Sequence, residues 1–142
     1  MNDLEFCARN GHLENIRRLI YDGADVTAND NYAAKQASHN GYLVVVKLLI
    51  KNGADVTSDN NYAIRLAFEY GHTKVVKLLI KNGADITAEN NYAIQFASRY
   101  GHIKVVELLI KNGADVTVNE NFPLMWYVGI YNGTFFNSKI IN

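Results

Sequence analysis

Residues 71–85 read GHTKVVKLLIKNGAD, and the same pattern returns 30 residues later at 101–115. Related copies begin at Gly11 and Gly41, again 30 residues apart, with no insertion or deletion between them. Around the pattern, residues 61–90 and 91–120 are identical at 20 of 30 positions. A sequence period of this length is typical of stacked supersecondary units, each of which packs on its neighbours. The chain is therefore predicted to be a repeat protein rather than one globular core.

Each repeat is predicted to contain two helices. In residues 61–90, Asn61 is a suitable N-cap, and residues 62–70 follow without a helix breaker. A second helix is expected over 72–81 and ends at Asn82-Gly83, because glycine readily adopts the left-handed conformation that stops a helix. Residues 85–90 then connect to the next repeat. The predicted unit is helix, tight turn, helix and loop.

The second helix explains why the repeats must stack. In residues 45–50, the aliphatic side chains span an arc of about 200°, whereas a helix that is covered on one side needs only about 100°. Neighbouring repeats must therefore cover both flanks. About six buried aliphatics at ~2 kcal/mol each do not offset an ordering entropy of ~1.5 kcal/mol per residue over ~30 residues. A lone repeat is not expected to fold.

The motif Gly-His-x-x-Val-Val-x-Leu-Leu-Ile-x-x-Gly-Ala-Asp, seen at 71–85, resembles the second half of the ankyrin repeat. The resemblance covers essentially the whole chain. It implies an all-α solenoid of stacked helix–turn–helix units with short connecting loops, in a curved stack whose concave face binds other proteins. The short repeat, rich in Asn and Tyr, also resembles the ankyrin arrays that giant DNA viruses encode in multiple copies.

The first half of the repeat departs from the family. Ankyrin repeats carry Thr-Pro-Leu-His, where this chain has Tyr62-Ala63-Ile64-Arg65 and its equivalents. The repeat is also about three residues shorter than the usual ~33, and the deficit lies before the first helix. We therefore expect short turns in place of a projecting β-hairpin. To replace the lost threonine hydroxyl, we expect helix caps from Asn31, Asn61, Asn91 and Asn121.

The chain divides into five predicted units. They are an N-terminal capping repeat (1–29), three repeats (30–59, 60–89 and 90–119) and a degenerate C-terminal repeat or cap (120–142). In the first unit, Asn15 and Arg18 make polar the flank that no earlier repeat covers. In the last unit, the fourth repeat is expected to be covered by Phe122, Leu124, Met125 and Trp126.

The composition excludes several classes of function. Basic and acidic residues number 14 each, so the net charge of zero gives no general attraction to nucleic acid or anionic membranes. No apolar run is long enough to span a membrane, and the start at Met1 lacks the features of a signal peptide. Cys7, the single cysteine, is expected to be a small buried side chain. We expect an intracellular, cytoplasmic monomer (in the host cytoplasm for a viral protein) with no nucleic-acid or membrane partner.

No catalytic set, metal site or cofactor site is predicted. His12, His72 and His102 share one repeat position, but helices packed ~8–10 Å apart separate them too far for zinc–nitrogen bonds of ~2 Å. A hydrogen bond from each histidine to the backbone of another repeat is expected instead. Turn hydrogen bonds are expected for the aspartates that follow Gly-Ala, which are Asp25, Asp55, Asp85 and Asp115. A solvated face, with weak anion or RNA contact as the alternative, is expected for Lys47, Lys51, Lys74, Lys77, Lys81, Lys104 and Lys111.

Partner binding is predicted at positions that vary between repeats, because packing does not fix them. These positions are Lys35, His39, Asn40, Arg65, Glu69, Tyr70, Gln95, Arg99 and Tyr100. Tyr70, Arg99 and Tyr100 lead, since Tyr and Arg are favoured interface anchors. The predicted function is a non-catalytic protein–protein interaction module. The alternative is an adaptor that recruits a host complex, such as a ubiquitin ligase, through its C-terminal segment (121–142), where Phe122-Pro123-Leu124 faintly resembles an F-box-like tail.

Overall fold

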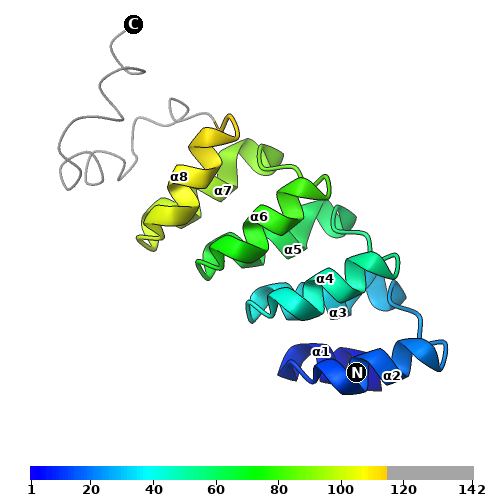
Figure 1. Cartoon of the computed structure of the whole chain (residues 1–142). Coiled ribbons are helices and arrows are strands. Elements are labelled where there is room, and N and C mark those ends of the chain that lie inside the picture. The colour runs from blue at the N-terminus through cyan, green and yellow to red at the C-terminus, as the bar shows by residue number, and fades with distance from the viewer. Residues whose placement is uncertain (115–142) are drawn as a thin grey trace, which may run out of the picture.

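The computed structural model describes residues 1–114, apart from the side chains of 88–91, and within this range it consists of eight helices without a strand. The helices form four pairs: α1 (Asp3–Asn10) with α2 (Leu13–Tyr21), α3 (Ala28–His39) with α4 (Leu43–Lys51), α5 (Ser58–Glu69) with α6 (Thr73–Lys81), and α7 (Ala88–Arg99) with α8 (Ile103–Lys111). Successive pairs stack in one direction (Figure 1). The prediction of an all-α stack is confirmed for these residues.

The pairs arrange the helices in two rows. The first-helix row contains α1, α3, α5 and α7, and the second-helix row contains α2, α4, α6 and α8. Neighbouring helices of the first-helix row pack more closely than those of the second-helix row. The stack therefore curves, with the first-helix row on its concave side. In Figure 1, α4, α6 and α8 are nearer to the viewer than α3, α5 and α7.

The core lies between the two rows and continues through all four pairs. Each second helix after α2 contributes a fully buried valine and leucine, such as Val76 and Leu79 in α6. The first helices contribute larger side chains as well, such as Ile64 and Phe68 in α5, but each of α3, α5 and α7 also has a completely buried alanine: Ala37, Ala67 and Ala97. Because alanine allows close approach of two helix backbones, these residues account for the tighter packing of the first-helix row.

A left-handed turn precedes the regular part of α3 and of α5. Asn29, Asp30 and Asn31 have φ angles of 51°, 53° and 61°, and residues 59–61 repeat this conformation. Asn and Asp tolerate this region better than other non-glycine residues, because their short polar side chains can hydrogen-bond locally. The expectation of short turns in place of a β-hairpin is therefore confirmed for these two connections.

The asparagine that ends each left-handed turn does not cap its own helix. The Asn31 Oδ1 accepts a hydrogen bond from the N–H of Asp55 at 2.7 Å, and the Asn61 Oδ1 accepts one from the N–H of Asp85 at 2.8 Å. The cap prediction is thus wrong for Asn31 and Asn61, because both side chains bind the backbone of the following repeat. The cap predictions at 91 and 121 lie outside the described side chains.

The end of the second helix and the outer flank of the first helix pair both follow the sequence prediction. Gly83 adopts a φ of 93°, and the N–H of Ala84 donates to the carbonyl of Leu79 at 3.1 Å, which closes α6 as expected. At the first pair, Asn15 and Arg18 are exposed while Ile16 is fully buried, so the polar outer flank is confirmed. The predicted cap at 120–142 lies outside the described residues.

Candidate functional site

One side of each first helix faces away from the core, on the concave side of the stack. In α5, Tyr62, Arg65 and Glu69 recur with the i, i+3, i+7 spacing of a single helix face, and each retains exposure to solvent. Ala63 and Ala67 beside them are buried. We call this side of α3, α5 and α7, together with the residues that end these helices, the concave face.

The nine predicted binding residues differ in their exposure on the concave face. Lys35 is buried; the half-buried residues are His39, Arg65, Glu69 and Gln95; the exposed ones are Asn40, Tyr70, Arg99 and Tyr100. The four exposed residues come from the last turns of α3, α5 and α7 or directly follow them. The stack therefore brings them to one edge of the concave face.

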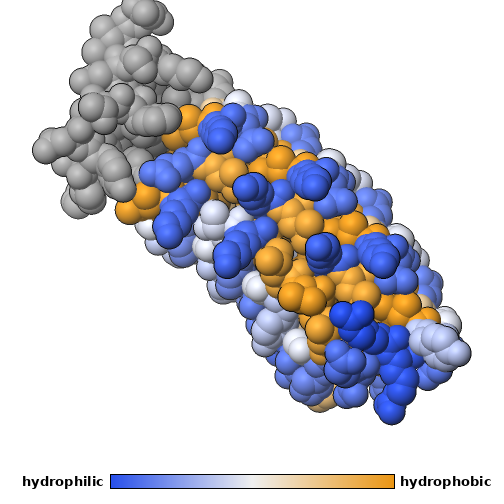
Figure 2. Space-filling model, viewed as in Figure 1, coloured by the Kyte–Doolittle hydropathy of each residue, from blue (hydrophilic) through white to orange (hydrophobic). Residues whose placement is uncertain are grey.

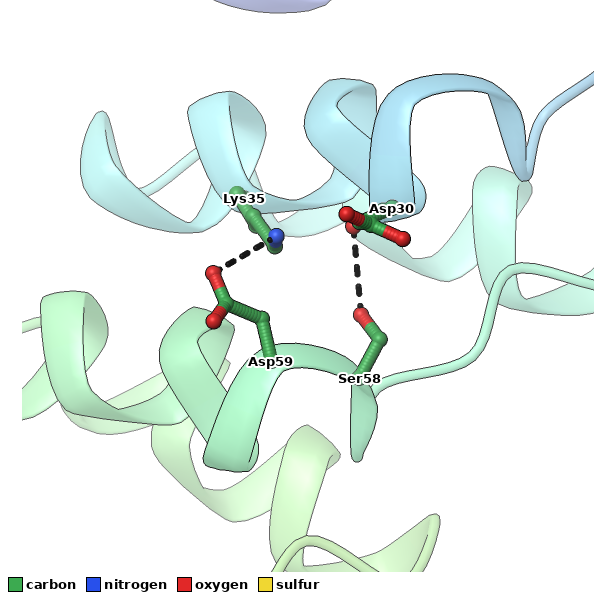
Figure 3. A network of polar contacts seen from close by, with 4 residues as sticks. All are labelled: Asp30, Lys35, Ser58 and Asp59. Atoms are coloured by element: carbon green, nitrogen blue, oxygen red, sulfur yellow. Dashed lines mark hydrogen bonds and ion pairs between the residues drawn. The ribbon is translucent and has the colours of Figure 1, made fainter.

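Lys35 does not present its charge to a partner, in contrast to its predicted role in extending the binding surface. Its side chain is 8% exposed, and its Nζ lies 3.0 Å from the Oδ2 of Asp59 in the next repeat. Figure 3 shows these two side chains facing each other, beside a hydrogen bond of 3.2 Å from the Ser58 hydroxyl to the Asp30 carbonyl. Lys35 thus joins two repeats, because burial of an ammonium group requires a paired carboxylate.

Tyr70 is an exposed ring that other side chains hold in place. Its ring stacks on that of His39, with centroids 4.3 Å apart and planes 25° apart. The His72 ring belongs to the same repeat as Tyr70 and lies 6.5 Å from it, and the His72 Nε2 is 2.7 Å from the carbonyl of His39 in the preceding repeat. Since a carbonyl only accepts, Nε2 carries the proton. Despite these contacts, Tyr70 remains 48% exposed.

Tyr100 occupies the same place one repeat later. Its ring centroid lies 6.2 Å from that of His102 and 6.0 Å from that of Phe96, and the side chain is 51% exposed. Arg99, directly before it, is exposed as well. The concave face therefore presents two tyrosine rings, one repeat apart, and a guanidinium group beside the second ring.

The structure adds two tyrosines that the sequence prediction missed. The Arg65 guanidinium carbon lies 5.3 Å from the Tyr62 ring centroid and 4.9 Å from that of Tyr92, so it sits between rings of successive repeats at cation–π distance. Tyr92 also stacks on Phe96 at 3.9 Å. Tyrosine recurs at this position in three repeats, whereas the predicted binding residues are positions that vary between repeats. The i, i+3 spacing from Tyr62 to Arg65 was the available signal.

Two of the three histidines that share a repeat position hold neighbouring repeats together, whereas the His12 ring contacts Phe6 of its own repeat. His72 bonds the carbonyl of His39, and the Nε2 of His102 lies 2.7 Å from the carbonyl of Glu69, which confirms the predicted backbone hydrogen bonds for these two residues. Among the described side chains, no group of three His, Cys, Asp or Glu residues is placed to hold a metal ion. Cys7 is buried, at 6% exposure, as predicted for a small core residue.

Three of the four aspartates after Gly-Ala form the predicted turn hydrogen bonds, and the fourth, Asp115, lies outside the described residues. The Oδ1 of Asp55 accepts from the N–H of Thr57 at 2.8 Å and from its hydroxyl at 2.7 Å, and Asp25 and Asp85 repeat this geometry. The bond from the threonine hydroxyl, followed by the bond from its N–H, lowers the pKa of Asp25 and of Asp55 below 3.8. These carboxylates stay ionised and structural at neutral pH.

Comparison with known proteins agrees with the geometry. A family model described as ankyrin repeats (3 copies) matches residues 4–90 and, one repeat further along, residues 31–120. No curated protein matches the chain in sequence. No helix in the described part of the chain has the length and apolar character needed to cross a membrane. The family match spans well over half of the chain, and the chain belongs to the ankyrin repeat family.

Proposed function

We propose that this chain is a non-catalytic module that binds a partner protein through the concave face. Ankyrin repeats are generally protein–protein interaction modules and are typically non-catalytic. The predicted residues Tyr70, Arg99 and Tyr100 are the proposed anchors, and Tyr62 and Arg65 are added to them as a half-exposed platform in the centre of the face.

The observation that carries the proposal is the pair of exposed tyrosine rings one repeat apart. Each ring is about half exposed and yet fixed by ring contacts, on His39 for Tyr70 and on Phe96 for Tyr100. Aromatic side chains that are already ordered lose little conformational entropy when a partner covers them. Tyr and Arg also dominate the residues that contribute most to protein interfaces. This arrangement supports binding rather than chemistry.

We also propose an oligomeric state and a cellular compartment for the chain. We infer a monomer in the cytoplasm with a protein partner, no cofactor and no nucleic-acid ligand. Cys7 is buried and is the single cysteine of the chain, so no internal disulfide contributes to stability. This is the usual condition of proteins from reducing compartments. The adaptor alternative rests on residues 121–142, which lie outside the described part of the chain.

The test is a comparison of tyrosine variants in affinity capture, followed by calorimetry with the captured protein. Tyr70→Ala with Tyr100→Ala should lower affinity at least tenfold, since each anchor contributes about 1–2 kcal/mol. The control is Tyr21→Ala, which removes a ring that is 90% exposed in the second-helix row. It should leave affinity unchanged. A marked fall in melting temperature of the double variant would show that the rings are core residues, and the binding assignment would fail.

A further inference from the structure

The second-helix row is strongly positive although the chain as a whole is neutral. Its four helices contain nine of the 14 basic residues and two of the 14 acidic residues, Glu14 and Glu107. The row therefore has a formal charge of +7, and the remainder of the chain has −7. Figure 2 shows this side of the molecule, where hydrophilic side chains project from a more apolar background. Such segregation of charge attracts an anionic partner to one side only.

Seven lysines of α4, α6 and α8 form the centre of this charge, and we call them the lysine face. All seven are exposed, and none forms an ion pair with a carboxylate among the described side chains. On α6, Lys74, Lys77 and Lys81 stand three and four residues apart, a spacing at which like charges repel each other. In the free protein these ammonium groups repel one another, and the carboxylates of an anionic partner would reduce that repulsion.

We propose that the lysine face binds an acidic helical segment of a second protein. Lys51, Lys81 and Lys111 hold the same position in successive repeats, so they form a line across the stack. Packed helices lie ~8–10 Å apart. In an α-helix, residues seven apart lie on the same face and about 10 Å apart along the axis. A helix with carboxylates at every seventh residue therefore matches the lysine line when it lies across α4, α6 and α8.

The composition of the lysine face favours a protein over nucleic acid or a membrane. The helices α4, α6 and α8 contain neither arginine nor an aromatic residue, so they lack the stacking groups and forked donors of nucleic-acid sites. Val44 is their one exposed large hydrophobic residue. The second-helix row also lies on the convex side of the stack, so a planar bilayer would contact only a small part of it. Separate carboxylates on a protein segment can reach each ammonium group without these features.

The experiment is a titration of the full chain with two synthetic helical peptides, followed by nuclear magnetic resonance. One peptide carries glutamate pairs, spaced four apart, in each of three successive heptads, and the other has the same composition with contiguous glutamates. The first peptide should bind more tightly and shift resonances of α4, α6 and α8. Replacing Lys51, Lys81 and Lys111 by Gln should weaken the affinity for the first peptide by about tenfold, since three exposed ion pairs are lost.

Matched variants separate this surface from the concave face. Lys81→Gln should weaken peptide binding, whereas Arg9→Gln removes the same charge from an exposed residue of α1 and should not. Tyr70→Ala with Tyr100→Ala should leave peptide binding intact, so failure of one proposal does not imply failure of the other. Equal affinity for both peptides, shifts confined to α3, α5 and α7, or tighter binding to poly-uridine RNA or phosphatidylserine vesicles would each overturn the proposal.

Discussion

Lys35 and Asp59 form an ion pair that crosses the joint between α3 and α5, and the two partners differ in burial. The side chain of Lys35 is 8% exposed and that of Asp59 is 56% exposed, at an Nζ to Oδ2 distance of 3.0 Å. An exposed ion pair contributes little. Here, however, loss of the carboxylate would leave a buried ammonium group without its anion. The consequences of substitution should therefore depend on which partner is removed.

Asp59→Asn should lower the free energy of unfolding by about 1–2 kcal/mol, because it leaves the Lys35 ammonium unpaired. Lys35→Met should cost less, since it removes the charge together with the need for a partner. The measurement is a double-mutant cycle by urea unfolding. Asp30→Asn is the control, because this aspartate is exposed in the equivalent left-handed turn and forms no ion pair in the described part of the chain. Equal losses for Asp59→Asn and Asp30→Asn would contradict the pairing.

Leu79→Ala should lower the free energy of unfolding by about 2–5 kcal/mol, because Leu79 is fully buried at the centre of the stack. Lys81→Ala should cost a few tenths to ~1 kcal/mol, as the loss of a cation from the last turn of α6. Thermal unfolding monitored by circular dichroism compares the two. Similar losses would mean that the buried and exposed sides of α6 are wrongly assigned.

Thr57→Val should change how stability depends on pH, because the Thr57 hydroxyl is the main cause of the lowered pKa of Asp55. A carboxyl whose folded pKa is lowered stabilises the fold above its unfolded pKa, and this contribution is lost as pH falls through the folded value. The wild type should therefore exceed Thr57→Val in melting temperature at neutral pH, and the difference should shrink below about pH 3.8.

Ser58→Ala is the matched control for the pH measurement. The Ser58 hydroxyl donates to the backbone carbonyl of Asp30, which does not titrate. Its loss should lower the melting temperature by a similar amount at every pH. A pH-independent difference for Thr57→Val as well would show that the hydroxyl does not act through the Asp55 carboxylate.

Gly41→Ala should destabilise the stack more than Gly101→Ala. Both glycines have a positive φ, 73° and 71°, so the backbone strain of about 1 kcal/mol is shared. A Cβ at Gly41 would also lie 2.5 Å from the His72 Nδ1, whereas no described atom lies within 4 Å of one at Gly101. Overpacking adds about 1–3 kcal/mol. Chemical unfolding of both variants measures the difference. Equal losses of stability would show that the His72 ring does not pack against Gly41.

The fold was predictable because every repeat poses the same packing problem. The 30-residue period, the wide apolar arc of the second helix and the glycine at its end each correspond to a feature of α6 that the structure confirms. The polar flank of α2 was predictable for the same reason, since Asn15 and Arg18 break a pattern that other repeats keep. Local periodicity is sufficient here because contacts join only neighbouring units.

Side chains that act between repeats were harder to predict. Asn31 precedes a helix, and from sequence alone its side chain is expected to accept a hydrogen bond from a backbone N–H in the first turn of that helix. Its true partner, the N–H of Asp55, lies 24 residues away, and the left-handed turn is what directs the oxygen toward it. Lys35 was assigned to the surface for a similar reason, because its position varies between repeats. One repeat earlier, Glu5 and Asn29 hold the equivalent positions and are also hydrogen-bonded, so the residue at the Lys35 position changes together with its partner in the next repeat.

The spacing of the asparagine–aspartate hydrogen bonds between repeats also has a consequence for how such an array can grow by duplication. Asn31 with Asp55 and Asn61 with Asp85 are equivalent donor–acceptor pairs that lie 24 residues apart. A duplicated segment of 30 residues carries a complete acceptor and a complete donor, so a copy inserted between two repeats finds a partner on each side. An insertion or deletion between the asparagine and the aspartate would change this 24-residue separation. The genetic unit of growth is therefore the whole repeat, and gene duplication can lengthen the stack without redesigning any joint.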